Sequence, residues 1–194
     1  MKSKSVRVTL VFFGIALISV SCHKSVKSRS DLFKFLSQPA NNLEVTQQVG
    51  EIETSVYYKP WKPINKGVAT HRTKNDSASL NKFKSKYFFV LSLSANHKEL
   101  LRQLPFEDYS EMVQVLAFRM SDYISAVTDD GKYVLPDQCL FEQTYGMGEA
   151  NHLMIIFDKS KFTNSKLITL HIKEFGLKTG NLNYKFDKQN LDDL

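Results

Sequence analysis

The sequence predicts an α+β fold in which antiparallel strands, arranged as a sheet or a sandwich, dominate one substantial helix. Three observations support this: the chain has 194 residues of which 42% are hydrophobic, several runs alternate or are continuously apolar, and one stretch has helical periodicity. An aromatic share of 12% argues against intrinsic disorder. No repeat of 20–50 residues occurs, which excludes solenoids and propellers.

The first expected elements are a short helix and two strands. Residues 30–36 begin with the capping pair Ser-Asp and contain four apolar side chains, which is typical of a short helix. Residues 43–48 favour a strand, and residues 52–58 show the two-residue alternation of a half-buried strand. The polar residues 65–79 predict a long exposed loop.

The most apolar strand and the main helix are expected next. Residues 86–94 are almost continuously apolar, which predicts a central strand that is covered on both faces. Residues 96–104 favour one or two helical turns. Apolar side chains then recur at spacings of three and four, which predicts a helix over about 107–120, with acids near its start and Arg119 near its end as the helix dipole favours.

The remaining part of the chain is expected to be β-structure. Residues 123–128 and 132–135 flank an Asp-Gly pair, a pattern typical of a hairpin. Further strands are expected at residues 138–144, 153–158, 167–173 and 182–186. Residues 144–149 form a glycine-rich stretch that predicts a turn between two of them. Together these elements give about eight strands in a single domain over residues 31–194.

Residues 1–21 have the three-part pattern of a secretory signal peptide. Residues 1–7 carry three positive charges and no acid, and residues 8–20 are thirteen mostly apolar residues. As a helix, thirteen residues rise only about 20 Å, which is short of a hydrocarbon core of about 30 Å. A buried N-terminal helix or an uncleaved anchor is the alternative, but the run has no polar face.

The end of this segment resembles the lipobox of bacterial lipoproteins, because the small Ser21 directly precedes Cys22. Ser19 stands where Leu is usual, as in the relaxed lipoboxes of Bacteroidota. The resemblance implies cleavage before Cys22, diacylglycerol on its sulfur, and acylation of the freed amine. The alternative is plain secretion, with Cys22 left as a thiol or cut away.

Residues 22–30 are expected to be a lipidated tether that holds the domain at a membrane. Lys24, Lys27 and Arg29 precede the first acid, Asp31, and basic charge next to a lipid anchor suits anionic headgroups. Removing residues 1–21 lowers the net charge from +6 to +3 because three basic residues are lost and no acid. Most of the remaining excess of positive charge lies in the tether. The rest of the chain has no stripe of basic residues of the kind that binds nucleic acid, so we expect no nucleic-acid partner.

Some surface-exposed lipoproteins of Bacteroidota carry an acidic cluster directly after the lipidated Cys. No acidic residue follows Cys22 before Asp31, so this resemblance implies an outer-membrane protein that faces the periplasm. Residues 135–146, the Ile-Ile-Phe-Asp strand that follows, and residues 56–60 resemble small lipoproteins of flavobacteria and their relatives. That group has no assigned activity. The resemblance therefore implies a source and a lipoprotein, but no catalytic residues.

The sequence contains few candidates for chemistry. The five histidines, at positions 23, 71, 97, 152 and 171, have no metal-binding spacing, so no metal site and no cofactor beyond the acyl chains is expected. The pairs Glu107-Asp108 and Asp129-Asp130 are explained by a helix start and a turn. Cys139, in an apolar strand, is expected to act as a small core residue. We therefore predict a protein that is not an enzyme.

Trp61 is the strongest candidate for an exposed binding residue, because the prolines on both sides hold its segment extended. The alternative is a Trp that plugs the edge of the sandwich. Together with Tyr57 and the 62–79 loop, Trp61 is predicted to bind another envelope protein, in an accessory or assembly role. The alternatives from other classes are an envelope hydrolase, a lipid or carbohydrate binder, and a periplasmic immunity protein.

Overall fold

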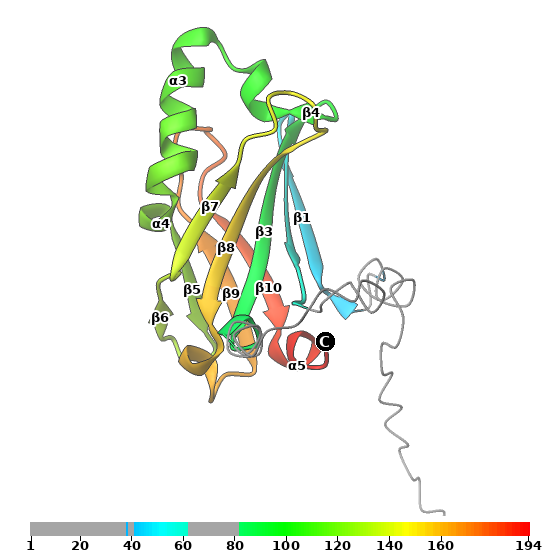
Figure 1. Ribbon diagram of the computed structural model, residues 1–194, viewed down its shortest axis with the longest axis vertical. Coiled ribbons are helices and arrows are strands. Elements are labelled where there is room, and N and C mark those ends of the chain that lie inside the picture. The colour runs from blue at the N-terminus through cyan, green and yellow to red at the C-terminus, as the bar shows by residue number, and fades with distance from the viewer. Residues whose placement is uncertain (1–37, 39–40, 62–81) are drawn as a thin grey trace, which may run out of the picture.

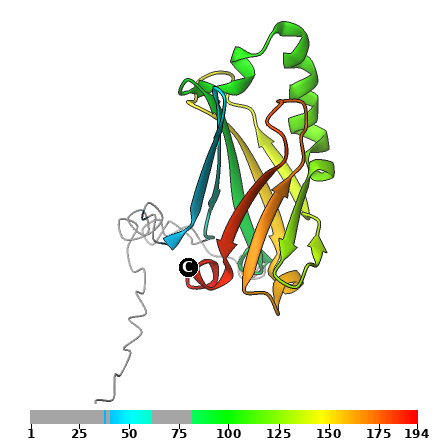
Figure 2. The same ribbon diagram turned by 180° about the vertical axis from the view of Figure 1, so that it is seen from behind.

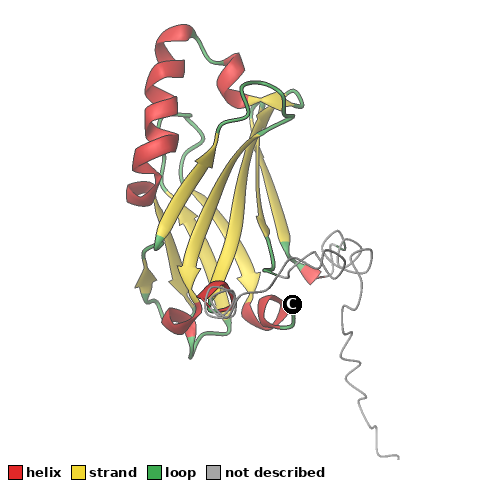
Figure 3. Cartoon of the chain, in the orientation of Figure 1, coloured by secondary structure: helices red, strands yellow, loops and turns green. Residues whose placement is uncertain are grey.

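The computed structural model describes residues 38, 41–61 and 82–194. They form two antiparallel sheets that pack face to face, with a long helix along one side (Figure 1). The predicted β-rich α+β fold with one substantial helix is thereby confirmed (Figure 3). The segments 1–21, 22–30, 30–36 and 65–79, for which we predicted a signal peptide, a tether, a helix and a loop, lie outside the described residues.

The larger sheet is built around the most apolar strand of the sequence. Its order is β1 (Glu44–Val49), β2 (Ile52–Tyr58), β3 (Lys86–Ala95), β8 (Asn151–Asp158) and β7 (Gln138–Glu142), and the short β4 (Lys98–Glu99) also pairs with β3. The register places Leu91 of β3 opposite Val56 on one side and opposite Leu153 on the other. β3 is therefore central, as its nearly continuous apolar sequence predicts.

In the smaller sheet, the strands β9 (Leu167–Ile172) and β10 (Leu182–Asp187) alternate between buried side chains and side chains that are more exposed. The order of this sheet is β10, β9, β5 (Ile124–Thr128) and the short β6 (Tyr133–Val134). In β10, Leu182, Tyr184 and Phe186 are buried, and the residues between them are exposed. This alternation is typical of an antiparallel sheet with one face on the core and one in water.

The core lies between the two sheets and is rich in aromatic rings. The ring of Phe89 in β3 lies 5.0 Å from that of Phe186 in β10, which joins the two layers. The turn η4 (Lys159–Phe162) places Phe162 against Tyr87 and Phe157, at centroid distances of 5.8 Å in both cases. Aromatic pairs at such separations stabilise a core beyond the area that they bury.

The long helix closes one side of the sandwich, beside β7 and β5 (Figure 2). It consists of α3 (Phe106–Gln114), the π-helical segment η3 (Val115–Arg119) and α4 (Met120–Tyr123), and so spans the predicted 107–120. Because a π turn contains one extra residue, both Val115 and Leu116 reach the core while Phe118 stays 81% exposed. No helix among the described residues is long and apolar enough to cross a membrane.

The two ends of the sandwich differ, and we call them the base and the tip. At the base, the chain enters at Asn41, whose carbonyl accepts a hydrogen bond from Asn190 Nδ2 of α5 (Lys188–Asp192) at 3.0 Å. At the tip lie β4, the turn η2 (Leu100–Gln103) and the start of α3 (Figure 1). Residues 96–104, predicted as helical turns, thus contain a short strand before the turn.

Candidate functional site

The outer face of the larger sheet is apolar toward the base. In β3, Tyr87, Phe89 and Leu91 point into the core, so Phe88 and Val90 point the other way. Their neighbours in register on β2, β8 and β7 are also apolar. We call this set the apolar face; Phe88 and Val90 at its centre are 8% and 4% exposed, Leu140 is 50% exposed, and the other members are the half-buried Tyr57, Met154 and Ile156.

Trp61 extends the apolar face at the base. Its ring stacks on Phe83 at a centroid distance of 5.7 Å, and the ring of Phe83 lies 6.3 Å from that of Phe88. None of these three side chains belongs to the core cluster. Trp61 is half-buried outside the core rather than plugging the sandwich edge, and it lies on the same side of the sheet as Tyr57. The 62–79 loop lies outside the described residues.

The corresponding outer face of the smaller sheet is mainly polar, although it also carries Val127, Leu167 and the 71% exposed Tyr133. Its members include Ser125, Thr169, His171, Asn183 and Lys185. His171 Nδ1 lies 2.8 Å from Asn183 Oδ1, so the face carries its own polar pairing. The two sheets share one core, and the outer face of the larger sheet carries more apolar side chains than that of the smaller sheet.

The outer face of the larger sheet, in its half nearer the tip, contains a polar hollow of about 410 Å³. Its lining includes Glu53, Ser92, Ser94, His97 and His152. The Nδ1 atom of His152 is buried and has no hydrogen-bond partner in the described part of the chain. Within residues 41–61 and 82–194, no three acidic, histidine or cysteine side chains are placed to hold a metal ion.

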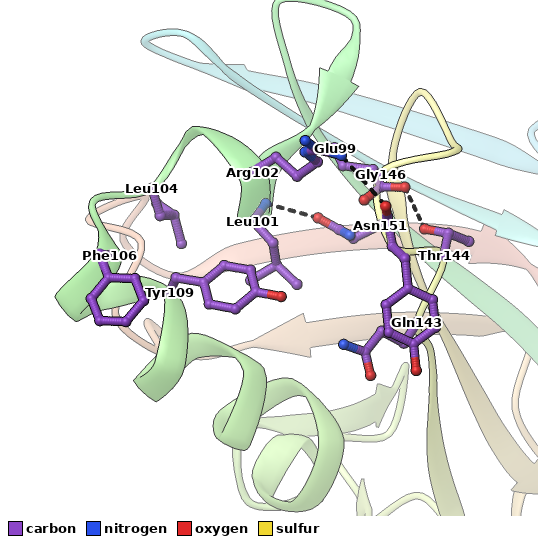
Figure 4. A pocket seen from close by; sticks show the side chains of 11 residues that line it. Glu99, Leu101, Arg102, Leu104, Phe106, Tyr109, Gln143, Thr144, Gly146 and Asn151 are labelled. Atoms are coloured by element: carbon purple, nitrogen blue, oxygen red, sulfur yellow. Dashed lines mark hydrogen bonds between the residues drawn. The ribbon is translucent and has the colours of Figure 1, made fainter.

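A cavity of about 440 Å³ lies at the tip, and sequence reasoning missed it. Leu104, Phe106 and Tyr109 line one side, and Gln143 and Thr144 line the other (Figure 4). The cavity also touches Glu99, Leu101, Arg102, Tyr145, Gly146 and Asn151. Its walls are therefore mainly aromatic and aliphatic, with a few polar groups among them.

The polar groups of the tip cavity are held in place by buried hydrogen bonds. The Glu99 side chain is 3% exposed, and its carboxylate accepts hydrogen bonds from the Thr144 hydroxyl and, at 2.9 Å, from the Gly148 amide. Burial alone would raise the pKa of Glu99, but these hydrogen bonds and Arg102 hold it below its ordinary value. Asn151, 2% exposed, accepts a hydrogen bond from the Leu101 amide at 2.9 Å.

The glycine-rich stretch forms the predicted turn, and that turn is also a wall of the tip cavity. Gly146 has a φ of +81°, and a Cβ at this position would overlap the Arg102 side chain. Arg102 Nη1 lies 3.4 Å from the Tyr145 carbonyl oxygen, so it donates a long hydrogen bond to the turn. The sequence could not reveal this wall, because Glu99 and Thr144 are 45 residues apart.

Cys139 and the acidic pairs occupy structural positions. Cys139 points inward from β7 and packs against the core, but it is only half-buried because β7 is an edge strand. Burial raises the pKa of its thiol to about 12. Glu107 and Asp108 lie in the first turn of α3, and Asp129 accepts a hydrogen bond from the Lys166 amide at 3.1 Å.

Cys22, on which the expected lipid anchor depends, lies outside the described residues, so the anchor stays a prediction. No family model matches the chain, and no curated protein matches it. The apolar face and the tip cavity are thus the two surfaces from which a function can be argued.

Proposed function

We propose that this chain is a membrane-anchored protein of the cell envelope that binds a protein partner on the apolar face. The observation that carries the proposal is the contrast between the two outer faces. Leu140 on the larger sheet is 50% exposed and Phe83, which contacts Phe88 at the base, is 44% exposed. The smaller sheet presents mainly polar residues such as Asn183 and Lys185, with Tyr133 as an exposed ring on its edge strand β6. Exposed apolar side chains at the margins of an apolar sheet face are candidates for contact with a partner.

The position of the apolar face suits a partner near a membrane. The described domain begins at Asn41 at the base. The Lys59 amide donates a hydrogen bond to the Phe88 carbonyl, which places the end of β2 at the base as well. Trp61 follows this point in the chain and stacks on Phe83, so both rings also lie at the base. Eighteen residues lie between Cys22 and Asn41, and the nineteen steps from one to the other extend at most about 63–68 Å. A lipid on Cys22 would keep the base within this distance of the bilayer, on the periplasmic side of the outer membrane.

Two acids with a lowered pKa, Asp158 and Glu174, lie outside the tip cavity and have structural roles. Asp158 has a lowered pKa because Ser160 and Lys86 donate hydrogen bonds to it, and it caps η4. Burial would raise the pKa of Glu174, but the Gly176 amide and further amides of its loop outweigh this and lower it. Both carboxylates accept hydrogen bonds that stabilise turns, and such structural hydrogen bonds also lower a pKa.

Site-specific photo-crosslinking in living cells tests the proposal. A photoreactive amino acid at position 140 lies on the apolar face, and one at position 185 lies on the polar face of the smaller sheet. We expect a discrete protein adduct from position 140, absent from position 185 and reduced by Trp61→Ala. Equal adducts from both positions, or none from position 140, would contradict the proposal.

A further inference from the structure

The tip carries three large apolar side chains that are almost fully exposed. Phe106, Tyr145 and Met147 are 85%, 73% and 87% exposed, and Phe106 and Tyr145 line the tip cavity. Exposed aromatic rings beside a cavity with buried polar groups are typical of a ligand site. We propose that the tip cavity binds a neutral saccharide, at a site separate from the apolar face.

The size and build of the cavity suit a small ligand. Its volume of about 440 Å³ falls within the range of roughly 300–1,000 Å³ that small-molecule sites occupy. Two of its polar side chains, Glu99 and Asn151, are more than nine-tenths buried and fixed by hydrogen bonds to backbone and side-chain groups. A ligand would therefore meet polar atoms that are already ordered, which lowers the entropic cost of binding.

The walls match the two faces of a sugar ring. A pyranose presents C–H bonds on its faces and hydroxyl groups around its rim. Phe106, Tyr109 and Leu104 lie on one side of the cavity and offer ring and methyl surfaces for the C–H faces (Figure 4). The Gln143 amide on the other side can both donate to hydroxyl groups and accept from them.

The charges favour a neutral polyhydroxyl ligand over charged or purely apolar ones. Glu99 is an ionised carboxylate that accepts hydrogen bonds, and Arg102 beside it is a donor of opposite charge. A phosphate group would be attracted by Arg102 and repelled by Glu99. An acyl chain would place apolar atoms against the exposed Gln143 amide and the Arg102 guanidinium, which costs free energy.

The tip cavity and the apolar face are separated along the sandwich. The cavity is lined by residues of β4 and α3, whereas Trp61 and Phe83 lie where β2 ends and β3 begins. Figure 1 shows β4 and the start of α3 at the opposite end of the sandwich from α5. Both sites can therefore be occupied at once. If the chain is anchored through Cys22 as proposed, the cavity lies at the end of the domain opposite to Asn41, where the chain enters the sandwich.

Isothermal titration of the purified mature chain with three neutral probes, chitotriose, maltotriose and cellotriose, tests the inference. We expect at least one probe to bind with a Kd below about 10 mM. Phe106→Ala should weaken that binding by about tenfold, because one stacking ring is removed. Phe118→Ala is the matched control, since Phe118 is 81% exposed on the same helix but does not line the cavity.

A second pair of variants guards against indirect effects. Tyr145 has a φ of +54°, so Tyr145→Asn removes the ring while keeping a residue that tolerates this conformation. Tyr133→Ala removes a ring of similar exposure, 71%, from the smaller sheet. Binding of none of the probes, or equal weakening by Phe106→Ala and Phe118→Ala, would overturn the inference. Either result leaves the crosslinking test of the apolar face unaffected.

Discussion

The hydroxyl of Tyr184 donates a hydrogen bond to Thr54 Oγ1 at 2.6 Å, and both side chains are fully buried. Tyr184 belongs to the smaller sheet and Thr54 to the larger one, so this bond crosses the core. The Thr54 hydroxyl in turn lies 3.2 Å from the Gln47 carbonyl oxygen, to which it donates. Burial raises the pKa of Tyr184 above its ordinary value, which keeps the donor protonated.

Tyr184→Phe should lower the free energy of unfolding by about 1–2 kcal/mol, because Thr54 loses its buried donor. Equilibrium denaturation in urea measures this change. Tyr133→Phe, at a 71% exposed position, is the matched control and should change stability by less than about 0.5 kcal/mol. A double-mutant cycle with Thr54→Val isolates the pair, and a coupling energy of zero would refute the bond.

Glu99→Gln should lower the free energy of unfolding at neutral pH and make it less dependent on pH in the acidic range. The folded-state pKa of Glu99 lies below its ordinary value, so the ionised carboxylate stabilises the fold above the unfolded pKa. This contribution is lost as the pH falls through the folded pKa, and the wild type should therefore lose more stability than the variant between about pH 5 and pH 3. Thermal melts across this range measure the difference. Glu111→Gln, on the exposed face of α3, should preserve the wild-type slope.

Alkylation of Cys139 in the native protein should be slow. Burial raises the pKa of the thiol to about 12, and only the thiolate reacts. In a Cys22→Ala background, which leaves Cys139 as the single thiol, we expect labelling at pH 8 to be slower than that of free cysteine by roughly two to three orders of magnitude. Mass spectrometry follows the label, and equal rates in native and denatured protein would contradict the inward orientation.

Trp61→Ala should weaken partner capture while leaving the fold largely intact. Trp61 is half-buried and contacts Phe83 outside the core, so we expect the free energy of unfolding to fall by about 1 kcal/mol. Phe89→Ala in the core should cost about 3–5 kcal/mol by comparison. Denaturation and photo-crosslinking from position 140 measure the two effects. A loss of stability as large as that of Phe89→Ala would instead make Trp61 a structural residue.

Cys22→Ala should release the protein from the membrane fraction, because the proposed lipid has no other attachment site. The wild-type chain should begin at Cys22 and carry the mass of acyl chains. Cell fractionation and mass spectrometry of the purified protein measure these outcomes. An unmodified amino terminus, or a leader still attached, would show that the anchor is wrong.

The sequence by itself determined the strands and the helix. Alternation over residues 52–58 and the apolar run in residues 86–94 were enough to place β2 and β3, because side-chain periodicity is a local property. The helix was found in the same way. The sequence missed its π turn, because that turn is set by packing Val115 and Leu116 together against the core.

Only the tertiary structure decided which surfaces these elements present. Phe88, Tyr57 and Met154 form one face because non-local pairing sets their register, and no short window of sequence contains that information. In the same way, Glu99 meets Thr144 at the tip only after β3 has paired with β8 and brought two distant loops together. Local side-chain periodicity therefore determined the individual strands, and the pairing of distant strands determined both candidate sites.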